Sequence, residues 1–348
     1  MAKRNKRKRN FVWTFVIAIC LLFFSFILFS YYLLNKKIDA NEIYVEVYSN
    51  NSIYKIVEYF NFNGLLKPKE FFIPFLRLYR IVTNEIPVSG TYRFTNQNSN
   101  FDIIRSIFSG KNLSIVKVTY PEGITVRDFA LITQRKLDID TTEFYDAITK
   151  GNYISKLNIP INSIEGYLMP ETYFFYTQTN PQVVVRKLIE TQNKIWEQKF
   201  ERICKEKGLS RHFVLTLASL IELESPLKEE RKRISGVFYN RLRKGMRLES
   251  DPTVQFALST KKRLDIKDLD VSHPYNTYKI KGLPPGPLCS PSVTSIEAAI
   301  YPEEHNYLYF VSYGDGSGRH RFATTFKEHL INKKLFKKAL KEKNSASK

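Results

Sequence analysis

The sequence predicts an α+β protein with a single N-terminal transmembrane helix, a small α+β module and a larger mixed α/β domain. Three observations support this prediction. An uncharged run extends from Phe11 to Leu34, strand-like alternation then gives way repeatedly to helical periodicity, and a long helical stretch follows from about Pro181 to Lys207. Roughly 310 residues follow the span, which is enough for two or more compact units.

The run from 11 to 34 is long enough to cross a hydrocarbon core as a helix. Six lysines and arginines precede it between positions 3 and 9, against only Lys36 and Lys37 directly after it. This asymmetry predicts a cytoplasmic tail over 1–10, a single-pass anchor in the cell membrane, and an extracytoplasmic remainder. A cleaved signal peptide is the alternative, but no small-x-small site follows the run. Lipidation of Cys20 is disfavoured because Ile19 precedes it.

The net charge of +20 raises the question of a nucleic-acid partner. Much of this charge lies in the N-terminal cluster and in the basic tail over 333–348, so we expect no nucleic acid. A mildly basic ectodomain suits an anionic polymer instead. Three cysteines without metal or redox spacing predict neither a disulfide framework nor a cofactor, and leave open whether Cys204 and Cys289 pair.

The elements of the first module follow from local patterns. Alternation predicts a strand, a polar cap predicts a helix start, and Asn-Gly or Gly predicts a stop. The expected elements are a strand at Glu42–Tyr48, a cap at Ser49-Asn-Asn-Ser, helices from Ile53 to Phe60 and from Lys69 to Arg80, a strand at Ser89–Phe94, a helix at Asn100–Ser109 and a strand at Ser114–Tyr120.

The apolar helical stretch from Phe213 to Leu223 contains one carboxylate, Glu222. An ionised carboxylate in apolar surroundings carries a desolvation cost, which suits such a residue to donate a proton near neutral pH. Glu224 lies about 200° further around the helix and should face elsewhere. The alternative is an ordinary ion pair with one of the nearby arginines, namely Arg231, Arg233 and Arg241.

Polar residues after this helix are candidates for binding a substrate, although each also fits a loop or a helix cap. With Ser219 on the helix itself and Glu171 in the aromatic stretch Gly166–Tyr176, the candidates are Tyr239, Asn240, Arg241, Asp251, Thr253, Gln255, Asn276 and Tyr278. The five histidines show no metal spacing. His320 is the one best placed to approach a substrate, although a structural role is favoured for it.

Several ordered motifs resemble those of the endolytic murein transglycosylase family. They are Glu165-Gly-Tyr-Leu-Met-Pro-Glu-Thr-Tyr, Leu217-Ala-Ser-Leu-Ile-Glu-Leu-Glu-Ser, Gly236-Val-Phe-Tyr-Asn-Arg-Leu-Arg-Lys-Gly-Met, Leu248-Glu-Ser-Asp-Pro-Thr-Val-Gln, Tyr275-Asn-Thr-Tyr, Gly282-Leu-Pro-Pro-Gly-Pro, Tyr307-Leu-Tyr-Phe-Val and Gly318-Arg-His-Arg-Phe. The resemblance implies a LysM-like glycan-binding module over 40–119 and a catalytic domain over 120–332. It also implies that Glu222 is the catalytic acid. The chain departs from the family pattern at Leu223, Ser225 and Cys289-Ser290.

The resemblance implies a lyase that cleaves peptidoglycan strands and has possible synthase partners in the elongation or division machinery. One carboxylate would protonate the oxygen leaving C1 of N-acetylmuramic acid and then accept the proton of the C6 hydroxyl, which closes a 1,6-anhydro ring. A hydrolase would need a second acid, for which Asp251 or Glu171 is available. Two alternatives therefore remain: a membrane-anchored muramidase and a non-enzymatic glycan-binding scaffold.

Overall fold

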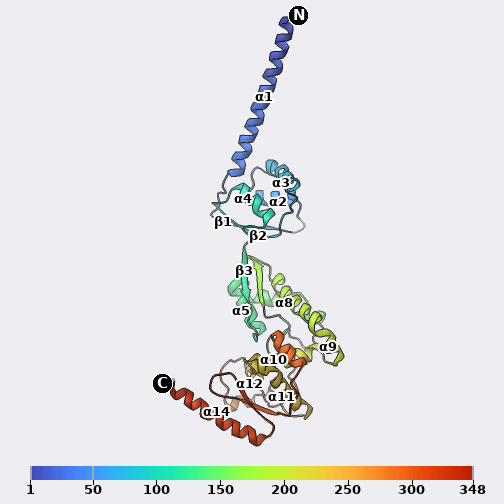
Figure 1. Ribbon diagram of the computed structural model, residues 1–348, viewed down its shortest axis with the longest axis vertical. Coiled ribbons are helices and arrows are strands. Elements are labelled where there is room, and N and C mark those ends of the chain that lie inside the picture. Colours follow the sequence, from blue (N-terminus) through green and yellow to red (C-terminus); the bar gives the residue numbers. More distant parts are fainter. Residues whose placement is uncertain (1, 49–50, 347–348) are drawn as a thin grey trace. The chain divides into compact units, whose positions relative to one another are not determined.

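The computed structural model describes residues 2–48 and 51–346, with side chains over 11–48 and 51–343. The chain forms two compact units, and it passes between them in the strand pair β3 (Ile115–Thr119) and β4 (Thr172–Tyr176) (Figure 1). The first unit comprises the chain up to Val116 together with Tyr176–Gln178, and the second comprises Lys117–Phe175 and Thr179–Lys348. The side chains of the predicted N-terminal basic cluster, and Ser49 and Asn50 of the predicted cap, lie outside the described residues.

The first unit contains one long helix and a small α+β core. Its elements are α1 (Ala2–Asn35), β1 (Glu42–Val47), α2 (Ile53–Phe62), α3 (Lys69–Thr83), β2 (Gly90–Thr95) and α4 (Asn100–Ser109). Strands β1 and β2 pair antiparallel with Glu42 opposite Thr95. Ser52 caps α2, and Ser99 and Asp102 form a capping box that starts α4. The predicted strands and helices of this module are therefore confirmed to within a few residues.

The end of α1 is built into the core of this unit. Leu33 is buried among core residues that include Phe72 and Ile103. The side-chain amide of Asn100 donates to the carbonyl of Leu33 at 2.9 Å, and the Asn100 backbone N–H donates to the carbonyl of Lys36 at 3.0 Å. Because these bonds join α1 to α4, the helix continues into the folded module without a flexible linker.

Residues 11–35 of α1 have the length and hydropathy of a membrane-spanning helix, with a mean hydropathy of 2.7. An N-terminal signal sequence has the same length and composition. The predicted α+β class with one apolar N-terminal helix is confirmed. In the part of the chain that the structure describes, the sheets are small, with two strands in each of three sheets.

The second unit is mainly helical. In chain order it contains α5 (Val126–Leu137), α6 (Thr141–Lys150), α7 (Tyr153–Lys156), α8 (Pro181–Ile195), a π-helical turn (Trp196–Phe200), α9 (Glu201–Glu206), α10 (Arg211–Glu224), a 3-10 turn (Lys228–Glu230), α11 (Arg231–Arg243), α12 (Asp251–Ala257), a 3-10 turn (Ile266–Asp270), α13 (Val293–Ile300), β5 (Tyr309–Ser312), β6 (His320–Ala323) and α14 (Phe326–Ala346). The predicted long helix from 181 to 207 is thus continuous but changes to π-type hydrogen bonding in its middle.

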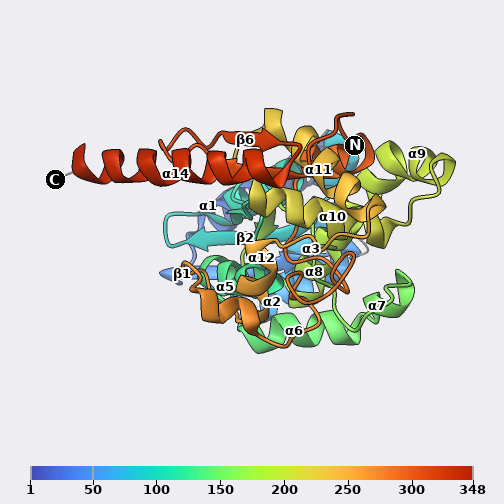
Figure 2. The ribbon, with the colours of Figure 1, turned by 90° about the horizontal axis from the view of Figure 1, so that it is seen from below.

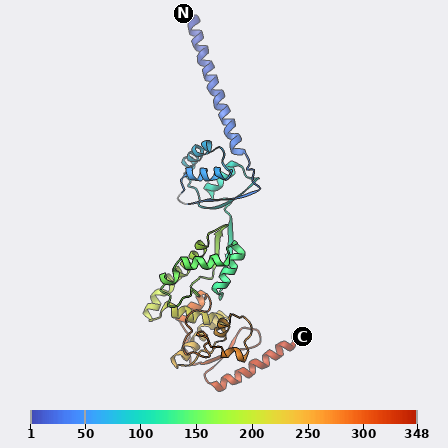
Figure 3. The same cartoon turned by 180° about the vertical axis from the view of Figure 1, so that it is seen from behind.

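Helix α6 packs against both α5 and α8, and Figure 3 shows these helices from behind in green to yellow-green. The buried helix α10 packs against α13 and α11, as Figure 2 shows for α10 and α11 from below. Every residue of α10 from Val214 to Ile221 is buried. This is why α10 is apolar on all sides, and why its last turn, which carries both acids, is held firmly in place.

Candidate active site

The C-terminal turn of α10 presents Glu222 and Glu224 to different parts of the second unit. Ser210 caps the start of the helix by accepting a hydrogen bond from the backbone of Phe213 at 3.1 Å. The helix ends at Ser225, whose backbone leaves the helical conformation. The two carboxylates have no hydrogen-bond partner in common, so the prediction that they face different directions is confirmed.

Glu222 is held by two internal partners. Its Oε1 accepts a hydrogen bond from Arg231 Nη2 at 2.7 Å, and its Oε2 accepts from the backbone N–H of Ser292 at 2.9 Å and from the Ser292 hydroxyl. The side chains of Glu222 and Arg231 are only 6% and 5% exposed. Arg231 also donates to Ser292 and Thr294. Glu222 is buried as predicted, but as one half of an ion pair and not in purely apolar surroundings.

Glu224 has one neutral hydrogen-bond partner, the hydroxyl of Ser250 at the start of α12. Desolvation, with a smaller contribution from the charge of Asp251, raises the pKa of Glu224 to about 7, against the opposite effects of the hydrogen bond from Ser250 and the charge of Arg241. As whole residues, Glu222 and Glu224 are both half-buried. Glu224 is thus a desolvated acid that can hold a proton near neutral pH.

Asp251 and Tyr278 lie beside Glu224. The Tyr278 hydroxyl donates to Asp251 Oδ1 at 2.7 Å. Burial and then this hydrogen bond raise the pKa of Tyr278 above its usual range, and the charge of Glu224 contributes to the increase. The structure therefore brings together two of the predicted binding residues, Asp251 and Tyr278, with an acid that the sequence analysis set aside.

Four other predicted binding residues are buried, and their side chains form hydrogen bonds within the protein. Ser219 accepts from the backbone of Leu288 at 3.0 Å, and Thr253 donates to the carbonyl of Ser250. Asn276 donates to two backbone carbonyls in the loop before it. Arg241 donates to the carbonyls of Leu308, Arg247 and Leu248. Such bonds position loops around the site, and they leave these side chains little freedom to bind a sugar.

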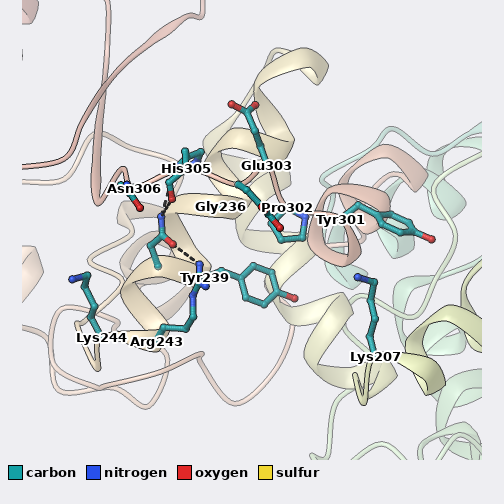
Figure 4. A pocket seen from close by; sticks show the side chains of 12 residues that line it. Lys207, Gly236, Tyr239, Arg243, Lys244, Tyr301, Pro302, Glu303, His305 and Asn306 are labelled. Atoms are coloured by element: carbon teal, nitrogen blue, oxygen red, sulfur yellow. Dashed lines mark hydrogen bonds between the residues drawn. The ribbon is translucent and has the colours of Figure 1, made fainter.

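Tyr239 and Asn240 lie elsewhere, on an open pocket of about 910 Å³ (Figure 4). Its lining residues come from α11, the end of α9 and the segment after α13: Lys207, Gly236, Tyr239, Asn240, Arg243, Lys244, Tyr301, Pro302, Glu303, Glu304, His305 and Asn306. Asn240 donates to the carbonyls of His305 and Tyr307 at 2.7 and 2.9 Å, and Tyr239 donates to the carbonyl of Ala299. Neither acid of α10 lines this pocket.

Gln255 and Glu171 complete the predicted set. Gln255 donates to the carbonyl of Lys262 at 3.0 Å, which closes a local loop. Glu171 is exposed, and its backbone carbonyl accepts from Tyr120. In the part of the chain that the structure describes, neither residue hydrogen-bonds to Glu222 or Glu224, so the arrangement gives no support to Glu171 as a second acid.

A further buried acid, Glu165, was not singled out from the sequence. It accepts hydrogen bonds from the backbone N–H of Val126, the first residue of α5, at 3.0 and 3.1 Å. Burial raises the pKa of Glu165 to about 8, against the effect of these backbone hydrogen bonds. Its position in the motif Glu165-Gly-Tyr-Leu was the available signal, but its burial depends on packing that the sequence does not reveal.

The histidines and cysteines have structural environments. His320, the histidine that the sequence placed best to approach a substrate, has its Nδ1 in hydrogen-bond contact with Glu230 Oε2 at 2.7 Å. Both side chains are nearly buried. Cys204 and Cys289 are both buried free thiols. Among the described residues, no group of three or more histidine, cysteine or acidic side chains has the geometry to hold a metal ion.

The fold and the site define an α+β protein with one apolar N-terminal helix, whose second unit presents carboxylates at the end of a buried helix. The chain belongs to the YceG-like family, whose profile matches residues 45–335. The suspected family membership is thereby confirmed.

The relatives agree with this membership. The chain is 31% identical over 328 residues to the endolytic murein transglycosylase of Bacillus subtilis, with 88% of each chain covered. It is 29% identical over 256 residues to the endolytic murein transglycosylase of Streptococcus pneumoniae, covering 64% of this chain and 46% of that protein. A crystal structure of a YceG-like protein from Listeria monocytogenes matches with a TM-score of 0.58 and 29% identity, covering 84% of this chain and 99% of that one.

Proposed function

We propose that this protein is a peptidoglycan lytic transglycosylase, a lyase that cleaves glycan strands internally between N-acetylmuramic acid and N-acetylglucosamine. The observation that carries the proposal is a desolvated acid with a pKa of about 7, Glu224, hydrogen-bonded by Ser250 at the end of α10, in a member of a family whose relatives are named for this activity. We further propose that α1 anchors the chain in the cell membrane with the second unit outside the cytoplasm, and that the first unit is a LysM-like glycan-binding module.

The reaction needs one acid that later acts as a base. The protonated carboxyl donates its proton to the glycosidic oxygen as the bond from C1 to that oxygen breaks. The C6 hydroxyl of the same N-acetylmuramic acid then attacks C1, and its proton passes to the carboxylate, which restores the acid. No water is consumed, and the product carries a 1,6-anhydro end. Because the nucleophile belongs to the substrate, its effective concentration is high without a second catalytic carboxylate.

Of the two acids on α10, the geometry favours Glu224 as this proton donor. Both oxygens of Glu222 already accept hydrogen bonds from Arg231 or Ser292, and the partner of Oε1 is a cation. Glu224 has a single neutral partner and a raised pKa. Glu222, the acid that the family resemblance implies, remains the alternative for this role. If Glu222 is not the proton donor, its bonds to Arg231 and Ser292 hold the loop at Ser292 in place.

Asp251 and Tyr278 are the binding residues that this proposal uses. Both have polar atoms next to Glu224, where they can hydrogen-bond the hydroxyl and acetamido groups of the sugars on either side of the scissile bond. Asp251 is also the acid that a muramidase would need to activate water. The mass of the product separates these two activities, because the anhydro end lacks the elements of one water.

The test compares Glu224→Gln with Glu222→Gln in the purified full chain. We expect Glu224→Gln to lower the release of anhydro-ended fragments from isolated sacculi by a factor of about 10² to 10⁴. Glu222→Gln should retain more activity, with any loss following the fraction of folded protein. Product masses are measured in the same digests.

Three outcomes would contradict the proposal. A loss confined to Glu222→Gln, in folded protein, would assign the acid to Glu222. Reducing ends in place of anhydro ends would establish a muramidase. Undiminished glycan binding without cleavage by the wild-type chain would favour a glycan-binding scaffold.

A further inference from the structure

Helix α3 has two apolar faces, of which only one is buried in the protein. Phe72 and Leu76 point into the core of the first unit and are fully buried. A second face, made of Phe71, Phe75, Leu78 and Val82, has the spacing of four, three and four residues that places side chains on one side of a helix. We call these four residues the outer face of α3.

The outer face becomes steadily more exposed towards the end of the helix. Phe71 and Phe75 are partly covered, whereas Leu78 is 59% and Val82 is 75% exposed. Ile81 beside them is 76% exposed, and Ile86 after the helix is 69% exposed. Exposed apolar side chains are common singly, but a continuous group of this kind marks a surface that another apolar phase covers.

The outer face begins at the apolar helix α1. The ring of Phe71 lies edge-on to the ring of Phe29 with 6.4 Å between centroids, and it stacks on Phe75 at 5.8 Å. In Figures 1 and 3, α3 lies on the side of the first unit from which α1 projects, and the pair β1–β2 lies on the opposite side. The apolar surfaces of α1 and α3 therefore meet at Phe29 and Phe71.

The depth of Phe29 in the helix agrees with a position at the membrane boundary. Phe29 is the eighteenth residue after Phe11, so it lies about 27 Å along α1 from the first residue of the apolar run. The hydrocarbon core is about 30 Å thick. Tyr31 and Tyr32, which follow Phe29 on α1, are exposed and are the residue type enriched where a helix leaves the hydrocarbon.

Charge on the flank of α3 fits lipid headgroups. Arg77 and Arg80 are exposed beside the outer face, and within the described residues neither lies in an ion pair. Lys36 and Lys37 at the end of α1 add two more exposed cations. A helix with apolar residues on one side and arginines beside them is suited to lie in the interface of an anionic bilayer.

We propose that the outer face of α3, together with Ile81 and Ile86, inserts into the outer leaflet of the bilayer that α1 crosses. The inference rests on the proposed anchoring by α1 and goes beyond it, because it assigns a second lipid contact. The ordered junction between α1 and α4 holds α3 at the level of Phe29, so this contact needs no rearrangement of the unit.

The test places a photoreactive benzoylphenylalanine at Leu78, or at Val82, in the otherwise unchanged full chain. The protein is reconstituted into vesicles of phosphatidylglycerol and phosphatidylethanolamine and illuminated, and lipid adducts are measured by mass spectrometry. The matched control is the same substitution at Lys111, an exposed residue just after α4. Because α4 starts beside the end of α1 and runs for 10 residues, Lys111 is expected well above the bilayer.

We expect several-fold more lipid adduct from a probe at Leu78 or Val82 than from one at Lys111. In a second experiment the probe is placed at Ile86, and we expect several-fold less adduct there when Leu78→Gln, Ile81→Gln and Val82→Gln are combined. The three side chains are exposed, so the combined variant should fold. Equal adducts at all sites, or adducts with a second copy of the chain in place of lipid, would overturn the proposal. Extraction of the chain from membranes by an alkaline wash would instead refute anchoring by α1. Glycan cleavage is measured separately on soluble strands, so a failure of the proposed enzymatic activity is distinguished from a failure of lipid contact.

Discussion

Glu222 and Glu224 are two residues apart on α10, yet their surroundings give them different chemistry. The partners of Glu222 are a buried arginine and two donors of Ser292, which fix its position. Glu224 faces the hydroxyl of Ser250 and the charge of Asp251. A fixed ion pair favours structural support, whereas a desolvated acid near other acids is the arrangement found at many proton-transfer sites.

The raised pKa of Glu224 predicts a pH-dependent cost to stability. The carboxyl group has its ordinary pKa of 4.5 in the unfolded chain and a pKa of about 7 in the folded one. The unfolded state therefore ionises first as pH rises, and the native protein loses on the order of 3 kcal/mol between about pH 4.5 and 7. Glu224→Gln does not titrate, so its stability relative to the wild type should increase over this range.

Denaturant unfolding of the wild type and Glu224→Gln at about pH 4 and about pH 8 measures this effect. The control is Glu171→Gln, a substitution of an exposed acid. A difference between wild type and Glu224→Gln that is the same at both pH values would show that Glu224 titrates normally.

The same pKa predicts the pH dependence of cleavage. If Glu224 donates the proton, kcat/KM should fall above about pH 7 as the free enzyme loses that proton. Rates on soluble glycan strands across neutral pH measure the position of this decline. A decline centred near the ordinary pKa of a glutamate would exclude Glu224 as the donor.

Glu222→Gln should destabilise the protein at neutral pH. It leaves Arg231, which is 4% exposed, without its negative partner, and breaking a buried pair in this way costs about 3–5 kcal/mol. Combining it with Arg231→Met should recover part of the loss, since no unpaired charge then remains. Thermal melts of both variants test this, and a single variant as stable as the wild type would contradict it.

The sequence could identify the acidic turn but not the environment of each acid. Its apolar pattern correctly predicted that Glu222 is buried, and Arg231 was one of three arginines considered as its partner. Ser292 lies 70 residues further along the chain, and no pattern in either segment indicates their contact. Glu224 was set aside because it lies on another face of the helix, and its partner Ser250 is brought to it only by tertiary packing.

At the scale of elements, α11 is held against the segment after α13 by a close approach at Gly236. A Cβ atom there would overlap the carbonyl oxygen of Glu303 and the ring of His305. The same segment is fixed by Arg233, which donates to Glu303 at 2.8 Å, and by Asn240. The helical backbone of Gly236 would suit any residue, so the lack of space for a side chain is what requires glycine here.

Gly236→Ala should cost about 3 kcal/mol, because the overlapping atom is backbone and cannot rotate away. The matched control is Gly245→Ala just after α11, where nothing lies within 4 Å of the added Cβ and φ is +63°. That control should cost about 1–2 kcal/mol through its left-handed backbone alone. Thermal unfolding compares the two, and equal losses would contradict a tight approach at Gly236.

Local patterns predicted most elements because their causes are local. The caps at Ser52 and Ser99 and the alternation in β1 lie within a few residues of the structure that they produce. Pairing is not local: β1 and β2 are separated by two helices, and the π-helical turn at 196–200 leaves no sign in the apolar spacing. The sequence therefore predicted the α+β class, but not three sheets of only two strands each.

For the whole molecule, the charge asymmetry around α1 predicts orientation. A reporter that becomes active only outside the cytoplasm, fused after Lys348, should be active, and the chain should remain with membranes after a high-salt wash. Reversing the sign of the N-terminal cluster by substituting its six basic residues with glutamate is the control and should reduce correct insertion. Activity of a reporter that works only in the cytoplasm would contradict the predicted orientation.

The two cysteines of the second unit are buried, which makes their thiols slow to react with oxidants. Burial raises the pKa of both Cys204 and Cys289, so little reactive thiolate is present, and neither thiol is bonded to the other. The unit reaches its fold without a disulfide, and therefore without the enzymes that form and reshuffle such bonds outside the cytoplasm. Its folding and its lifetime should thus be the same in reducing and in oxidising surroundings.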